Sequence, residues 1–167
     1  EADAAAAQAL PPMSDDQKRR ACSMLSKWEH PDLHFTFPTI KTSDMPSEHK
    51  PVSLDFIREW REMLLSQGPY IVISEWMKRM GKVDADFNKQ AIITAEESNN
   101  IARELMMMSN QGGYKISLMW LPERMNDESA NKILKLLEEP PRQTLFLLVS
   151  ENPELLLETI RSRAQRI

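Results

Sequence analysis

Three arginines stand close together near the C-terminal end of the sequence: Arg161, Arg163 and Arg166. A guanidinium group can stabilise negative charge on a phosphoryl group during its transfer, so residues of this type could act on a nucleotide. Clustered charges on a polar stretch are, however, most often a solvated surface. Spacing alone therefore permits a role in phosphoryl transfer without assigning one to any of the three.

Carboxylates and histidines give weaker patterns. Glu138 and Glu139 form a pair that acid–base chemistry could use, but Pro140-Pro141 follows at once and ends the helix there. A structural or interface role is the better interpretation of this pair. The basic run Lys18-Arg19-Arg20 is most simply a solvated face, with contact to a DNA backbone as the alternative. The histidines do not form a metal-binding cluster: His30, His34 and His49.

Cys22 is the only cysteine, which excludes an internal disulfide framework and indicates a reducing compartment. A structural zinc site normally has four ligands, so one thiolate cannot build it and we expect no zinc. Cys22 is then expected to be an ordinary buried small residue. No apolar run approaches the ~20 residues that cross a bilayer, and the alanine-rich start lacks the regions of a signal peptide. We therefore expect a cytoplasmic protein without a membrane partner.

Chain length and net charge further limit the class of protein that this sequence can encode. The 167 residues fit one domain, and a hydrophobic content of 41% is enough for a packed core. The formal net charge is −4, which argues against a basic domain that grips nucleic acid by itself.

The first half of the chain is predicted to place one strand among helices. The strand is expected at 32–38, where apolar residues alternate, and the helices at 1–10, 15–27, 53–65 and 70–80. Ser53 is expected to cap the helix that begins there, while Gly68-Pro69 and Gly81 end helices. The segment 39–93 resembles an inserted helical region.

The second half is predicted to alternate helices with strands: 94–109, 114–121, 126–139, 144–150 and 153–160. Thr94 and Glu97 have the spacing of a capping box, and Asn126 can cap the next helix. The strands at 114–121 and 144–150 are almost entirely apolar, so each is predicted to be buried on both faces of a parallel sheet. The order of elements indicates a doubly wound α/β fold.

The stretch from Ala130 to Ile167 closely resembles the clamp-loader ATPase family of bacterial DNA polymerase III. The family pattern is a helix ending in L-L-K-x-L-E-E-P-P, a buried strand and a closing S-R-C; the matching residues are Leu134 to Pro141, Thr144 to Ser150, and Ser162-Arg163-Ala164. Two earlier segments also match: His30-Pro31-Asp32 and Gly112-Gly113-Tyr114-Lys115. The resemblance implies an AAA+ (RecA-like) core fragment over 1–167, of the three-layer P-loop NTPase type. The core is expected to be incomplete at its N-terminal side and to lack the family's lid and collar domains.

The residues that hydrolyse ATP in this family are missing. A hydrolysing member has Asp-Glu at the end of the strand before the L-L-K-x-L-E-E-P helix, to hold magnesium and polarise water. Trp120-Leu121-Pro122 occupies that place. A G-x-x-x-x-G-K-[ST] loop is not found either, which is weaker evidence, because Glu1 to Leu10 resembles the helix that follows this loop. The resemblance therefore favours the non-hydrolysing delta-prime type, with a degenerate ATP site and no cofactor. The alternative is an ATP-hydrolysing motor of the gamma or tau type.

What the resemblance implies for function centres on Arg163. In this family the S-R-C arginine reaches the ATP of the neighbouring subunit, and Ser162 would shape its turn. The implied role is to organise the polymerase III loader rather than to act as an ATPase. The implied partners are the gamma/tau and delta subunits and, through the complex, the sliding clamp and primed DNA.

Overall fold

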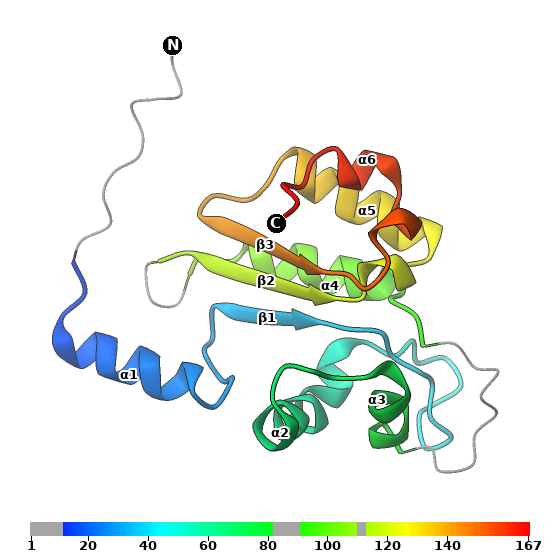
Figure 1. Cartoon of the computed structure of the whole chain (residues 1–167), viewed down its shortest axis with the longest axis horizontal. Helices are drawn as coiled ribbons and strands as arrows, with labels where there is room; N and C mark the ends of the chain where they lie inside the picture. Colours follow the sequence, from blue (N-terminus) through cyan, green and yellow to red (C-terminus); the bar gives the residue numbers. More distant parts are fainter. Residues whose placement is uncertain (1–11, 82–90, 110–112) are drawn as a thin grey trace.

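The computed structural model describes residues 12–81, 91–109 and 113–167. The helix predicted at 1–10 lies outside them. At the centre is a three-stranded parallel sheet in the order β1-β2-β3 (Figure 1). Its strands are β1 (Leu33–Thr36), β2 (Lys115–Trp120) and β3 (Thr144–Val149). Ile116 of β2 lies between Leu33 and Leu145 in the register, so the predicted parallel α/β core is confirmed.

Helices cover both faces of β2. On one face lie α4 (Ala95–Met106) and α5 (Asp127–Glu138), which pack together. On the other lie η1 (Ser53–Phe56), α2 (Ile57–Gln67) and α3 (Ile73–Arg79), which follow β1 in the chain (Figure 1). Met119 belongs to the first core, whereas Leu118 and Trp120 contact the second. This alternation buries β2 on both faces, as its apolar sequence predicted.

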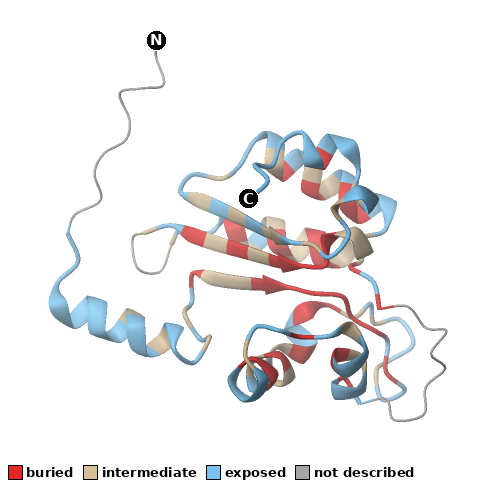
Figure 2. Ribbon diagram, in the orientation of Figure 1, coloured by how far each residue is buried: buried red, intermediate tan, exposed pale blue. Residues whose placement is uncertain are grey.

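The prediction that β3 is buried on both faces is wrong. Phe146 and Leu148 pack against the core beside α4 and α5. Leu145, Leu147 and Val149 are 46%, 38% and 49% exposed, and Figure 2 shows the alternation along the strand. The physical reason is position: β3 is the edge strand farther from the helices that follow β1, and these helices cover β1 and β2 instead.

Cys22 is exposed, which corrects the expectation of a buried residue. It lies on α1 (Asp15–Leu25), a charged helix of which no residue is buried. Figure 1 shows α1 beside the amino end of β1, outside the layers of the core. Because α1 does not pack against the core, its residues remain exposed or only partly buried. No helix in the described part of the chain is long and apolar enough to span a membrane.

Helix ends follow the predicted signals in some places and not in others. Asn126 accepts a hydrogen bond from the Ser129 amide at 2.8 Å, so the predicted N-cap of α5 is confirmed. Gly68 follows α2 with a φ of +78°, which a residue with a Cβ rarely adopts. Thr94 stands at the N-cap of α4 but makes no side-chain cap bond. The predicted capping box is therefore absent, because the Glu97 carboxylate accepts a hydrogen bond from the Ser53 amide instead.

Candidate functional site

The carboxyl end of β2, where a motor subunit carries its acids, is filled by apolar packing. Trp120 is the last residue of β2 and is 6% exposed. Its ring centroid lies 5.3 Å from that of Trp60, which in turn stacks on Phe37 at 4.4 Å. Magnesium requires oxygen ligands in near-octahedral geometry, and an indole side chain offers none.

The two residues after Trp120 complete this packing. Leu121 is 1% exposed, and Pro122 behind it is fully buried at the start of η2 (Pro122–Arg124). Leu121 adopts a left-handed conformation with a φ of +56°, and its amide donates to the Val149 carbonyl at 2.8 Å. The turn is thus tied to β3, and its side chains point into protein rather than toward an open site.

Glu123 is the carboxylate that follows Trp120-Leu121-Pro122 most closely along the chain, and its contacts give it a structural role. Its Oε1 accepts hydrogen bonds from the Glu151 amide at 3.0 Å and the Asn152 amide at 3.1 Å. These amides precede η3 (Pro153–Leu155). The carboxylate therefore holds the turn that follows β3 through one of its two oxygens.

Arg163 lies just after α6 (Glu158–Arg161) and reaches across to α5. Its Nη2 is 2.7 Å from Oε1 of Glu138, and its Nη1 donates to the Thr159 carbonyl at 2.8 Å. The arginine side chain is 36% exposed. Arg163 is therefore accessible at the surface but fixed in direction.

Ser162 shapes the turn that presents Arg163. It is the C-cap residue of α6, and its hydroxyl donates to the Thr159 carbonyl at 3.1 Å. Ile160, fully buried, anchors the short helix. The neighbouring arginines behave differently from Arg163, because Arg161 and Arg166 both pair with Glu154.

Arg163 lies far along α5 from the turn that follows β2. The chain leaves β2 at its carboxyl end and enters α5 soon after, and α5 then runs back over the sheet before the connection to β3 (Figure 1). Glu138, the last residue of α5, holds Arg163 at that returning end. Arg163 is therefore separated from the end of β2 by about the length of α5.

A buried carboxylate links α4 to the segment after β1. Glu97 is 5% exposed, and its Oε2 accepts from the Ser53 amide at 2.7 Å. Ser53 was predicted to cap a helix; instead its hydroxyl contacts the backbone of Phe37, accepting from the amide at 3.0 Å. Burial raises the pKa of Glu97 to about 7, although the Ser53 amide opposes this by stabilising the charged form.

Comparison with known proteins identifies the family. A model of the family described as DNA polymerase III, delta subunit, matches residues 3–167. The chain belongs to this family. Relatives at 32–44% identity, each named DNA polymerase III subunit delta′, confirm the predicted resemblance to the delta-prime type.

Three of these delta-prime relatives come from different bacteria. The protein from Yersinia pestis is 44% identical over 73 residues, that from Escherichia coli (strain K12) 39% over 67 residues, and that from Bacillus subtilis (strain 168) 40% over 53 residues. These matches cover 42%, 39% and 32% of this chain, but only 21%, 20% and 16% of the relatives. The matched segments thus represent about a fifth of the length of a relative or less.

A gamma subunit-related protein from Thermotoga maritima is similar in structure. The likeness has a TM-score of 0.45 at 19% sequence identity, and it covers 88% of this chain and 45% of the other.

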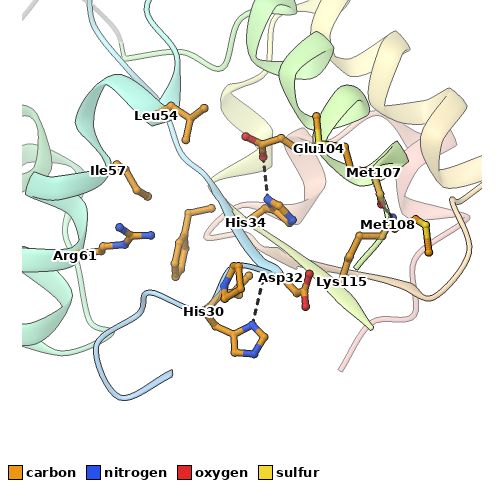
Figure 3. A pocket seen from close by; sticks show the side chains of 13 residues that line it. His30, Asp32, His34, Leu54, Ile57, Arg61, Glu104, Met107, Met108 and Lys115 are labelled. Atoms are coloured by element: carbon orange, nitrogen blue, oxygen red, sulfur yellow. Dashed lines mark hydrogen bonds and ion pairs between the residues drawn. The ribbon is translucent and has the colours of Figure 1, made fainter. Parts of the chain in front are cut away.

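In this member of the delta-subunit family, the His-Pro-Asp motif lines a surface pocket of about 250 Å³ between α2 and α4 (Figure 3). Nδ1 of His30 accepts from the Asp32 amide at 3.2 Å, and Nδ1 of His34 lies 2.9 Å from Oε2 of Glu104. Nζ of Lys115 donates to the Met107 carbonyl at 2.7 Å, at the end of α4. The polar groups of the pocket thus have partners within the fold, and these bonds hold β1 and β2 to α4.

Metal ligands do not gather in the part of the chain that the structure describes. No group of three or more His, Cys, Asp or Glu side chains there is placed to hold a metal ion. The third histidine, His49, pairs with Asp55 at 2.8 Å. Sequence reasoning named Glu97 and Glu138 but missed their contacts with Ser53 and Arg163, because neither contact is local in sequence.

Proposed function

We propose that this protein is a clamp-loader subunit of DNA polymerase III that does not hydrolyse ATP itself. The observation that supports this most strongly is the carboxyl end of β2, where Trp120-Leu121-Pro122 is buried in aromatic and aliphatic contacts. Phosphoryl transfer requires carboxylates or equivalent groups to hold magnesium and orient water. The nearest carboxylate, Glu123, is engaged with backbone amides.

The contribution of the subunit to catalysis is then Arg163, supplied to the ATP of a neighbouring subunit. Its distance from the end of β2, across the length of α5, supports action in trans, because it is remote from the place where the subunit's own acids would stand. A guanidinium at the transferring phosphoryl group neutralises charge that builds up in the transition state. The partners are the gamma/tau and delta subunits. Through the complex, the protein serves the sliding clamp and primed DNA in the cytoplasm.

The test is Arg163→Ala in the loader reconstituted from full-length subunits. We expect ATP turnover at the adjacent site to fall by about 10³-fold or more, the range seen when an arginine finger is removed. Arg166→Ala is the matched control, because Arg166 is also a surface arginine of this segment and pairs only with Glu154 at 3.7 Å among the described residues. Unchanged turnover in Arg163→Ala would refute the proposed finger.

A further inference from the structure

We propose that Glu138 is a positioning residue for Arg163, an inference that rests on the proposed function of that arginine. Glu138 is the last residue of α5, and its Oε1 lies 2.7 Å from Nη2 of Arg163. The Thr159 carbonyl accepts from Nη1 at 2.8 Å. The carboxylate at the end of α5 and a carbonyl within α6 therefore accept from the two terminal nitrogens of one guanidinium.

These contacts fix the guanidinium group and still leave some of its N–H donors for a ligand. A guanidinium carries five N–H donors in a fixed plane. One edge of the group faces Glu138 and Thr159, which leaves further donors for the oxygens of a phosphate. Because the plane is rigid, fixing one edge also sets the direction of the other.

The ion pair is not explained by stability alone. Glu138 is 42% exposed and Arg163 36%, and pairs this accessible contribute little to folding. The helix macrodipole also disfavours a carboxylate at the C-terminal end of α5. The adjacent carboxylate, Glu139, has no ion pair among the described residues. Only one of two neighbouring carboxylates at this helix end is thus directed at the arginine.

The benefit to catalysis is preorganisation. A long, mobile arginine loses rotamer freedom when it engages a phosphate, and this cost reduces transition-state stabilisation. An arginine already held by Glu138 has lost that freedom beforehand. Removing the carboxylate should therefore slow the chemical step while the arginine itself remains available.

The experiment measures steady-state ATP hydrolysis by the loader reconstituted with full-length subunits. For Glu138→Ala we expect kcat to fall about three- to tenfold, the cost of ordering one long side chain, with an unchanged KM for ATP. Glu138→Gln should retain most of the activity, because an amide oxygen accepts the same hydrogen bond. Glu139→Gln is the matched control and should behave as the parent.

A double variant separates this inference from the proposed finger. Glu138→Ala should have no further effect in an Arg163→Ala background, because the residue acts only through the arginine. Parental or higher turnover in Glu138→Ala, with Arg163→Ala impaired, would overturn the positioning role and leave the finger intact. Unchanged turnover in Arg163→Ala would overturn both. Equal losses in the Gln and Ala variants would also contradict the role of the hydrogen bond.

Discussion

Replacing Glu97 by Gln should stabilise the protein above neutral pH. The carboxyl group is 5% exposed between α4 and η1, and burial raises its pKa from 4.5 to about 7. The folded state therefore favours the neutral form, which a glutamine imitates in size and in polarity. The amide oxygen can accept the same bond from the Ser53 amide, now 2.7 Å from Oε2.

The sign and size of the effect follow from the two pKa values. Below 4.5 the carboxyl is protonated in both folded and unfolded states, and its contribution to stability is fully present. As the pH rises, the unfolded chain loses its proton first, and the contribution is lost until the folded pKa near 7 is passed. Each pH unit corresponds to about 1.4 kcal/mol, so the loss approaches about 3 kcal/mol.

Urea unfolding of the parent and of Glu97→Gln between about pH 4.5 and pH 8 measures this difference. We expect less than about 0.5 kcal/mol at the lower limit and about 3 kcal/mol in favour of glutamine at the upper. The two proteins differ only at position 97, so the difference in their stability isolates Glu97. The control is Glu96→Gln, because that side chain is 41% exposed. A glutamine variant less stable at pH 8 would refute the reasoning, since it would show that the fold favours the carboxylate.

Three substitutions test a packed side chain, a helix cap and a strained backbone position, each by urea or thermal unfolding. Trp120→Ala should cost about 3–5 kcal/mol, because the indole is buried against Trp60; a cost under about 1 kcal/mol would contradict the apolar packing. Asn126→Ala should cost about 1 kcal/mol by removing the 2.8 Å cap bond to the Ser129 amide, and no loss would show that the cap is not needed. Gly68→Ala should cost about 1–3 kcal/mol from backbone strain alone, since φ is +78° and no atom lies within 4 Å of the added Cβ; a stabilising effect would exclude that strain.

Sequence reasoning was most successful where the signal is local. Gly68 and Asn126 mark helix ends because each satisfies a backbone requirement that neighbouring residues alone define. The apolar run of β2 predicted burial on both faces, and the two cores on either side of it confirm this. The missing acids of Trp120-Leu121-Pro122 were visible as residue types, and the structure adds that the turn is buried.

Contacts between segments far apart in the chain could not be predicted from the sequence. The spacing of Thr94 and Glu97 fits a capping box, but Ser53 lies 44 residues away and its amide binds Glu97 instead. The run of β3 is as apolar as that of β2, yet only the sheet order shows that one of its faces is uncovered. Likewise, Glu138 and Arg163 are 25 positions apart in the sequence and form a direct ion pair.

The most direct measurement is ATP turnover by the purified full-length protein alone, with magnesium and without the other subunits. We predict no hydrolysis above the background of the buffer, because the end of β2 presents an indole and aliphatic side chains where a motor holds metal and water. Sustained magnesium-dependent turnover that follows the protein through purification would contradict the central claim.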